Sequence, residues 1–244
     1  MKLHGNTILI TGGSSGIGLE LAKVLAKDNT VLICGRSSEK LEVARSLIPS
    51  LHTFQCDLSK RSECERLYQW VNKSFPQCNI LINNAAVVHK TNFLTDEQII
   101  NKAELEVHTN YLGPVNLTKL FIPMLEDKEN SKIIFITTGL VYAPKTAYPI
   151  YCSTKAALHS FVQTLRIQMA SSNIQIIEVQ MPATDTPFHE GNPPKIAIPV
   201  DKAVMEMMVG LDKGRAEIKV AGVKLLYRLS RIAPSFALKK INQT

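Results

Sequence analysis

The chain has 244 residues, of which 45% are hydrophobic, and a formal net charge of +7. A chain of this length buries a sizeable core, and no repeat, low-complexity tract or Gly/Ser-rich linker divides it, so we expect one domain over residues 1–244. The five cysteines are odd in number and lack C-x-x-C spacing, which argues against a disulfide framework and predicts free thiols without a metal site. There is no charged-then-apolar leader and no apolar run of roughly 18 residues, which predicts a soluble, cytoplasmic protein.

A glycine-rich turn follows the first predicted strand. Residues 6–10 form an apolar run, residues 11–18 read TGGSSGIG, and apolar residues at helical spacing come next. Such a strand-to-helix turn brings backbone N–H groups and a helix N-terminus to a phosphate, with Gly12 making the turn and Gly16 and Gly18 allowing close approach. An ordinary tight connection is the alternative. The other candidate residues of this phosphate site are Ser14, Ser15 and Ile17.

The same turn also matches a nucleophile elbow, because Gly12–Gly16 fits G-x-S-x-G. Asp185 and His189 even follow Ser14 in the order of a hydrolase triad. An elbow in the middle of a hydrolase sheet should follow several strands, however, and Ser14 follows only one. We therefore favour nucleotide binding.

Apolar runs alternate with helical patterns along most of the chain. This alternation predicts a parallel sheet that is covered by helices on both faces. The runs after the first lie at residues 30–34, 51–55, 79–82, 132–137 and 174–179.

The end of the second predicted strand bears on the choice of nucleotide. NAD enzymes place a carboxylate there for the ribose diol, whereas this chain has Gly35 and Arg36. A guanidinium suits a 2′-phosphate, so the sequence favours NADP(H) over NAD(H). A surface arginine that opens the next helix is the alternative.

Tyr151 and Lys155 are four residues apart, on one face of a predicted helix. A free phenol titrates near pH ~10, and a nearby cation lowers that value, so the pair could act as an acid near neutral pH. Taken alone, the spacing also occurs by chance in ordinary helices.

Together with other motifs, this pair resembles the short-chain dehydrogenase/reductase superfamily. The motifs in chain order are the turn at Thr11–Gly18, Cys56-Asp57-Leu58, Asn83-Asn84-Ala85-Ala86, Asn110, and Tyr151 with Lys155. The resemblance implies a single-domain, Rossmann-type, doubly wound α/β fold with about seven parallel strands, and a homo-oligomer, either a dimer or a tetramer. The overall pattern is also similar to the bacterial branch of this family that is named for an association with D-alanine esterification of teichoic acids.

The resemblance assigns catalytic roles to four residues. Tyr151 would exchange a proton with the substrate oxygen, while Lys155 would lower the pKa of Tyr151 and hold the nicotinamide ribose. Asn110 would fix a water of the proton relay, although a buried Asn in the helix expected over residues 104–121 could instead satisfy backbone groups. Thr138 stands where the family has Ser, and its extra methyl group narrows the site.

The resemblance also assigns residues to the adenosine half of the cofactor. Asp57 would accept a hydrogen bond from the adenine amino group, or would serve only as a helix cap. Leu58 would contribute backbone, and Asn83 with Ala85 would pack against the adenosine. Ala86 replaces the usual Gly of this motif, which predicts a slight local shift.

After the sixth predicted strand, the family's Pro-Gly is replaced by Met181-Pro182. Thr186 matches the residue that binds the nicotinamide carboxamide, although it could equally be a loop hydroxyl that faces water. Residues 183–199 are rich in proline and lack periodicity, which predicts a substrate loop.

The C-terminal extension, residues 213–244, holds the whole net charge. Residues 223–233 predict an amphipathic helix that ends at Pro234, and further apolar residues follow. Either this basic extension lies on an anionic membrane, or its apolar face packs on the domain or a second subunit. The sequence carries no nucleic-acid motif. The basic residues, opposed only by Glu217, are Lys213, Arg215, Lys219, Lys224, Arg228, Arg231, Lys239 and Lys240.

Two functions are consistent with these features. The first is an NADP(H)-dependent oxidoreductase that interconverts a carbonyl and a secondary alcohol, with a small-molecule substrate. The second is a catalytically weak or silent NADP(H)-binding sensor, and either one could be peripheral to a membrane.

Overall fold

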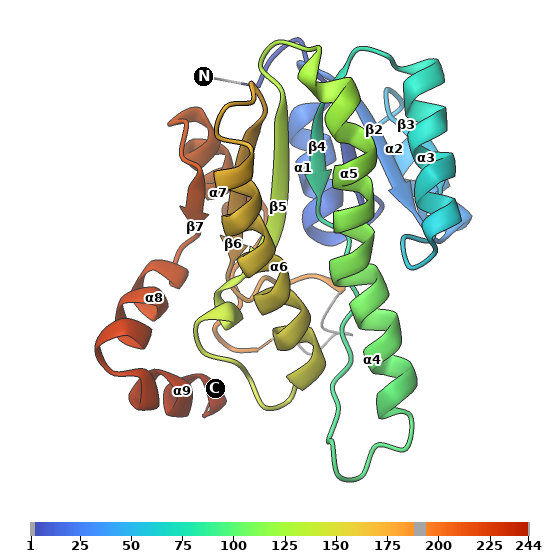
Figure 1. The fold of residues 1–244 in the computed structure, drawn as a ribbon. Helices are drawn as coiled ribbons and strands as arrows, with labels where there is room; N and C mark the ends of the chain where they lie inside the picture. The colour runs from blue at the N-terminus through green and yellow to red at the C-terminus, as the bar shows by residue number, and fades with distance from the viewer. Residues whose placement is uncertain (1–2, 188–193, 244) are drawn as a thin grey trace.

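The computed structural model describes residues 3–187 and 194–243. Seven parallel strands form one sheet in the order β3-β2-β1-β4-β5-β6-β7 (Figure 1). The strands are β1 (Thr7–Thr11), β2 (Thr30–Gly35), β3 (His52–Gln55), β4 (Cys78–Asn83), β5 (Lys132–Thr138), β6 (Gln175–Met181) and β7 (Glu217–Lys219). The chain reverses its direction of winding between β1 and β4, and ligands of such sheets bind beyond the carboxyl ends of the strands at this point.

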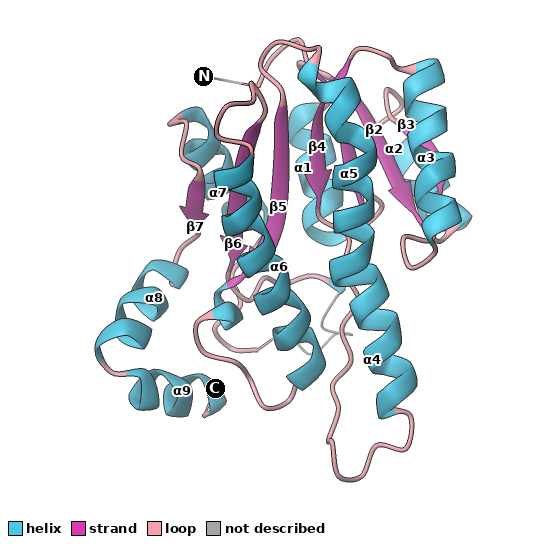
Figure 2. Ribbon diagram, viewed as in Figure 1, coloured by secondary structure: helices cyan, strands magenta, loops and turns pink. Residues whose placement is uncertain are grey.

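Helices cover both faces of the sheet (Figure 2). The helices are α1 (Gly16–Leu25), α2 (Ser38–Leu47), α3 (Arg61–Ser74), α4 (Ile99–Val107), α5 (Gly113–Glu126), α6 (Pro149–Gln168), α7 (Val200–Asp212), α8 (Val223–Ile232) and α9 (Pro234–Asn242). Helices α1, α2 and α7 pack on one face, and α3, α5 and α6 on the other. Side chains alternate along each strand, so Ile8 and Ile10 of β1 join the first core and Leu9 joins the second.

The doubly wound parallel sheet predicted from the sequence is confirmed. The six apolar runs correspond to β1 through β6, with ends that differ by one or two residues. The seventh strand had no sequence signal of its own, because β7 is three residues long and only Ile218 is buried.

The predicted helix over residues 104–121 is wrong in its bounds and its continuity. Helical structure runs from Ile99 to Glu126, but a π-helical turn, His108–Leu112, separates α4 from α5. The amide of Gly113 bonds the carbonyl of His108, five residues back. Pro114 has no N–H to donate and so cannot make the next α-helical bond, which favours this wider turn.

The two ends of the predicted substrate loop lie side by side. Thr184 and Ile198 form a parallel bridge, and the amide of Asp185 donates to the carbonyl of Ile198 across 2.9 Å. Residues 188–193, which include His189 and Pro193, lie outside the described residues, so the role of this loop stays a prediction.

The C-terminal extension contains the predicted helix and its break. Helix α8 ends at Ile232, and α9 begins at Pro234, whose missing N–H is tolerated in a first turn. Both helices lie beyond the end of β7, at the margin of the molecule (Figure 1). Within residues 3–187 and 194–243, no helix is both long and apolar enough to cross a membrane.

Candidate active site

A large cavity of about 1140 Å³ opens at the carboxyl ends of the strands. It is lined by the glycine-rich turn, by residues that follow β2, β4, β5 and β6, by the start of α6, and by the C-terminal helices. Most of the candidate residues predicted from the sequence meet here: Gly12, Ser14, Ser15, Gly16, Ile17, Gly18, Arg36, Leu58, Ala85, Thr138, Tyr151, Lys155 and Thr186. Three others, Asp57, Asn83 and Asn110, are not among the residues that line it.

The glycines of the turn fit closely against their surroundings. Gly12 has a φ of +64°, and a Cβ atom there would lie 2.9 Å from Cα of Ala85. A Cβ on Gly18 would overlap the carbonyl oxygen of Gly12. Gly18 therefore lets α1 pack on the turn, and because it also lines the cavity its expected role in ligand approach stays a prediction. Helix α1 begins at Gly16 without a side-chain cap, so its first amides are suited to an anion.

Thr11 and Asn84 tie the turn to the end of β4, a role of their side chains that was not evident from the sequence. The hydroxyl of Thr11 accepts hydrogen bonds from the amides of Asn84 and Ala85, at 2.9 and 3.0 Å. The side-chain amide of Asn84 donates to the carbonyl of Thr11 across 2.8 Å. Asn84 belongs to the Asn-Asn-Ala-Ala motif of the sequence, but the motif alone does not show that its side chain holds the turn.

Arg36 stands at the end of β2 and lines the cavity together with Lys40. Its backbone carbonyl accepts a hydrogen bond from the side chain of Gln55, which leaves the exposed guanidinium for other partners. Ser37 caps α2 by accepting a bond from the amide of Lys40. Two cations thus lie at the end of the cavity beside β2.

The predicted adenosine contacts divide between the cavity and the core. Leu58 lines the cavity, whereas Asp57 accepts hydrogen bonds from the amide and hydroxyl of Ser59, at 3.1 and 2.8 Å. The Asp57 carboxylate thus stabilises the turn before α3, close to the capping role left open by the sequence. Asn83 is 2% exposed, and its amide atoms are buried without a partner among the described residues.

Tyr151, Thr138 and Lys155 converge at the other end of the cavity. Burial, together with the charges of Cys152 and Glu106, raises the pKa of Tyr151, while a hydrogen bond from Thr138 acts in the opposite direction. Burial lowers the pKa of Lys155 to about 8. Burial has the largest effect on the pKa of Tyr151, and Lys155 is not among the groups that shift it in this state, so the expected lowering by Lys155 stays a prediction.

The geometry of Lys155 agrees with that result. Its ammonium lies 5.9 Å from the centre of the Tyr151 ring and donates to the carbonyl of Ile136 across 2.9 Å. Both side chains nevertheless line the same cavity, on successive turns of α6.

Asn110 sits in the π-helical turn and is fully buried. Its amide donates to the carbonyl of Val87 and accepts from the amide of Val87, both at 2.8 Å. A third bond, at 3.2 Å, reaches the hydroxyl of Thr154 on α6. Asn110 thus clamps the segment after β4, which lines the cavity, and satisfies backbone groups as the alternative interpretation proposed.

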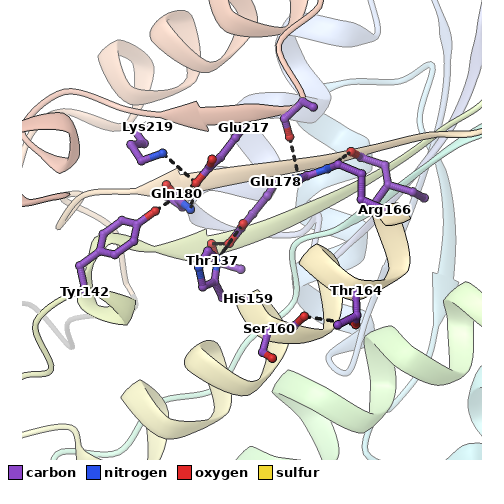
Figure 3. Close-up of polar contacts among 12 residues, drawn as sticks. Thr137, Tyr142, His159, Ser160, Thr164, Arg166, Glu178, Gln180, Glu217 and Lys219 are labelled. Carbon is purple, nitrogen blue, oxygen red and sulfur yellow. Dashed lines mark hydrogen bonds and ion pairs between the residues drawn. The ribbon is translucent and has the colours of Figure 1, made fainter. Parts of the chain in front are cut away.

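A buried carboxylate that carries no signal in the sequence acts on Lys155. Glu178 of β6 is fully buried and accepts bonds from the hydroxyl of Thr137 and from Nδ1 of His159, at 2.5 and 2.8 Å (Figure 3). Its negative charge raises the pKa of Lys155 against the larger effect of burial. His159 follows Lys155 by four residues on α6, so one helix face carries both partners.

A second carboxylate, Glu217 of β7, gathers polar side chains beside the first (Figure 3). It accepts bonds from Lys219, Gln180 and Tyr142, at 2.7, 2.9 and 3.1 Å. These bonds outweigh burial and lower the pKa of Glu217 to about 2. The Lys219 ammonium also lies 4.4 Å above the ring of Tyr227, so the cluster joins the sheet edge to α8.

His89 adds to the cavity a polar group that the sequence did not reveal. It lines the cavity, and both its amide and Nδ1 lie 2.8 Å from one carboxylate oxygen of Glu106. Burial raises the pKa of Glu106, although the contacts with His89 oppose this effect. These residues are 17 positions apart, so only the fold brings them together.

The comparison with known families decides the family. A family model described as short chain dehydrogenase matches residues 6–196. The chain belongs to this family. It is a short-chain dehydrogenase/reductase oxidoreductase, as the motifs predicted.

Known relatives and structures agree with this assignment. The chain is 42% identical over 226 residues to "uncharacterized oxidoreductase DltE" of Bacillus subtilis, with 89% of each chain covered. This relative confirms the branch to which the sequence pattern pointed. A short-chain dehydrogenase of Burkholderia cenocepacia in complex with NADP superimposes with a TM-score of 0.86 over 99% of each chain, at 21% identity.

A solved structure of another protein in complex with NAD has a similar fold. A short-chain dehydrogenase/reductase of Burkholderia phymatum in complex with NAD has a TM-score of 0.83, at 14% identity, and covers all of this chain and 98% of its own. At these identities the likeness shows the fold alone. Solved structures with this fold thus hold either dinucleotide.

Proposed function

We propose that this short-chain dehydrogenase/reductase family member is an NADP(H)-dependent oxidoreductase that interconverts a carbonyl and a secondary alcohol. The proposal rests on one observation. Tyr151, Thr138 and Lys155 line the same cavity as the glycine-rich turn and Arg36. We further expect a small-molecule substrate and a homo-oligomeric assembly.

The described residues fit a dinucleotide. The glycine-rich turn leaves room where side chains would otherwise lie, and the first amides of α1 are suited to the pyrophosphate. Arg36, with Lys40, would pair with the adenosine 2′-phosphate. Thr186 lies against Gly16, where a Cβ would be 3.3 Å from Cβ of Thr186, and would contact the nicotinamide half.

When bound, NADP(H) supplies or accepts the hydride. Tyr151 would donate its proton to the carbonyl oxygen of the substrate, and the raised pKa keeps the phenol protonated at neutral pH before reaction. The hydroxyl of Thr138 would hold the same oxygen by a hydrogen bond. The Lys155 ammonium would stabilise the phenolate that forms when the proton leaves.

The proposal is tested by cofactor binding and then by turnover. Thermal unfolding with NADPH and with NADH should show a larger shift with NADPH, since a ligand at a hundred times its Kd stabilises a protein by about 2.7 kcal/mol. A panel of ketones and aldehydes should then give NADPH oxidation that the Tyr151→Phe variant loses.

The outcomes separate the two functions that the sequence left open. Stabilisation without turnover on a broad panel would favour the catalytically silent NADP(H) sensor. Failure of both dinucleotides to stabilise the protein would contradict both functions. The Tyr151→Phe variant should keep the thermal shift, because the proposed cofactor contacts do not depend on its hydroxyl.

A further inference from the structure

The two C-terminal helices carry an unbalanced positive charge. Residues 213–244 contain eight basic residues and one acidic residue. The first 212 positions therefore hold twenty basic and twenty acidic residues, which balance. Beyond Glu217 the sequence has no acidic residue at all. The charge is therefore concentrated in one small part of the molecule.

One side of this helix pair is already occupied. Leu226 of α8 and Ile241 of α9 line the active-site cavity, and Ala237 is fully buried. The side chain of Asn242 accepts from the amide of Thr146 across 2.7 Å and donates to the carbonyl of Pro144 across 3.1 Å. The helices are therefore held against the segment that precedes α6.

The other side exposes large apolar residues. Leu225 and Ile232 are 61% and 85% exposed and lie two turns apart on one face of α8, and Phe236 of α9 is 57% exposed. Lys239 and Lys240 follow Phe236 by three and four residues, so they flank it on α9. An exposed apolar stripe bordered by lysines is typical of helices that lie in a membrane interface.

Five basic residues of this surface lack an acidic partner in the part of the chain that the structure describes. Within residues 3–187 and 194–243, no ion pair joins an acidic side chain to any of Lys224, Arg228, Arg231, Lys239 and Lys240. Arg231 instead stacks 5.5 Å above the ring of Tyr227. The other four side chains are exposed.

The charge also argues against a second copy of the chain as the occupant. A two-fold interface sets the same patch against itself, and here it would bring two exclusively basic surfaces together. An anionic lipid surface supplies both the opposite charge and an apolar layer. We propose that α8 and α9 dock the protein on anionic membranes through this basic, apolar surface.

Docking in this way would bring the wall of the cavity close to the lipid. Leu226 and Ile241 contribute to that wall from the reverse side of the same two helices. If the proposed oxidoreductase function holds, this arrangement suits a lipophilic carbonyl or alcohol that arrives from the bilayer. That last step rests on the proposed function, whereas the docking itself does not.

Vesicle flotation of the full chain tests the docking. We expect flotation with vesicles that contain phosphatidylglycerol, little with phosphatidylcholine alone, and a decrease at high salt. The apolar variant Leu225→Gln/Ile232→Gln/Phe236→Gln and the basic variant Lys224→Gln/Arg228→Gln/Lys239→Gln should each weaken binding about tenfold or more. The matched control Val43→Gln/Leu47→Gln alters residues of α2 that are 60% and 68% exposed, and should bind as the wild type does.

Several results would overturn the docking. One is that the wild type does not float with anionic vesicles. Another is that the apolar variant binds as well as the wild type, which would attribute the binding to charge alone. Light scattering that finds a wild-type dimer and a monomeric apolar variant would assign the surface to a second copy. Thermal unfolding verifies that each variant is folded. Flotation of Tyr151→Phe shows whether docking persists when turnover is lost, so a failure of the proposed catalytic function can be told apart from a failure of docking.

Discussion

The ammonium of Lys155 donates a hydrogen bond to the backbone carbonyl of Ile136 across 2.9 Å. This bond holds a 3% exposed cation at the end of β5, beside the cavity that Tyr151 lines. Burial lowers the pKa of Lys155 to about 8, so the residue can lose its charge under mildly alkaline conditions. The proposed function of Lys155 requires the charged form.

We therefore predict that kcat/KM for NADPH falls above pH 8. This parameter reports groups of the free enzyme, and the loss of one proton from Lys155 should reduce it about tenfold per pH unit. Steady-state rates between pH 6 and pH 10 measure the effect. In the Lys155→Arg variant the guanidinium stays charged, so any remaining activity should lack this decrease. A flat wild-type profile up to pH 10 would contradict the prediction.

The same burial predicts that Lys155→Met stabilises the protein without cofactor at pH 7. A folded-state pKa of about 8, below the ordinary 10.5, means that the unfolded chain binds more protons between these values. The free energy of unfolding of the wild type should therefore rise with pH in this window, and at pH 7 the buried charge costs on the order of 3 kcal/mol. Loss of the bond to Ile136 offsets about 1 kcal/mol, which leaves a net gain of roughly 2 kcal/mol.

Thermal unfolding of the Lys155→Met variant measures this gain. It should be largest at pH 7 and should shrink toward pH 10.5. Lys73→Met, at an exposed position of α3, is the control and should leave the midpoint nearly unchanged. A Lys155→Met variant that melts below the wild type at pH 7 would show that the bond to Ile136 outweighs the cost of burial.

The site could be predicted from the sequence where its residues belong to local motifs. Tyr151 and Lys155 share one helix, and the glycine-rich turn is continuous in the chain, so both could be recognised as local motifs that, taken together, resemble the family. Glu178 and His159 are 19 residues apart, on β6 and α6, and only the packing of that helix on the sheet brings them into contact. The π-helical turn around Asn110 was missed for a related reason, because helical periodicity does not distinguish a single wider turn.

Glu178 provides a second test of the electrostatics. Its charge raises the pKa of Lys155, so Glu178→Gln should move the alkaline decrease in kcat/KM below the wild-type value of about pH 8. Glu217→Gln is the matched control, since Glu217 is a neighbouring carboxylate, on β7, that is not among the charges that shift Lys155. If the pH profiles of Glu178→Gln and the wild type were identical, Glu178 would have no effect on the pKa of Lys155.

Cofactor preference should depend on Arg36. We expect Arg36→Ser to raise the Kd for NADPH about 10- to 100-fold, because hydrogen bonds to a charged group contribute about 1.5–3 kcal/mol. The Kd for NADH should change little. Arg45→Ser on α2 is the control, because that guanidinium is paired with Glu42 at 2.7 Å. Calorimetric titrations give both constants, and equal losses for the two dinucleotides would show that Arg36 does not select the 2′-phosphate.

The glycine-rich turn should tolerate no side chain at position 18. A Cβ on Gly18 would overlap the carbonyl oxygen of Gly12 and lie 2.6 Å from the side-chain amide of Asn84, so Gly18→Ala must displace α1 from the turn. Overpacking of this kind costs about 1–3 kcal/mol. The displaced helix N-terminus should also lose most of the stabilisation by NADPH. Gly222→Ala is the matched control, because its Cβ would meet no atom within 4 Å and its φ is −61°. Thermal unfolding with and without NADPH compares the two variants. If both behave alike, close packing at Gly18 is not what shapes the cofactor site.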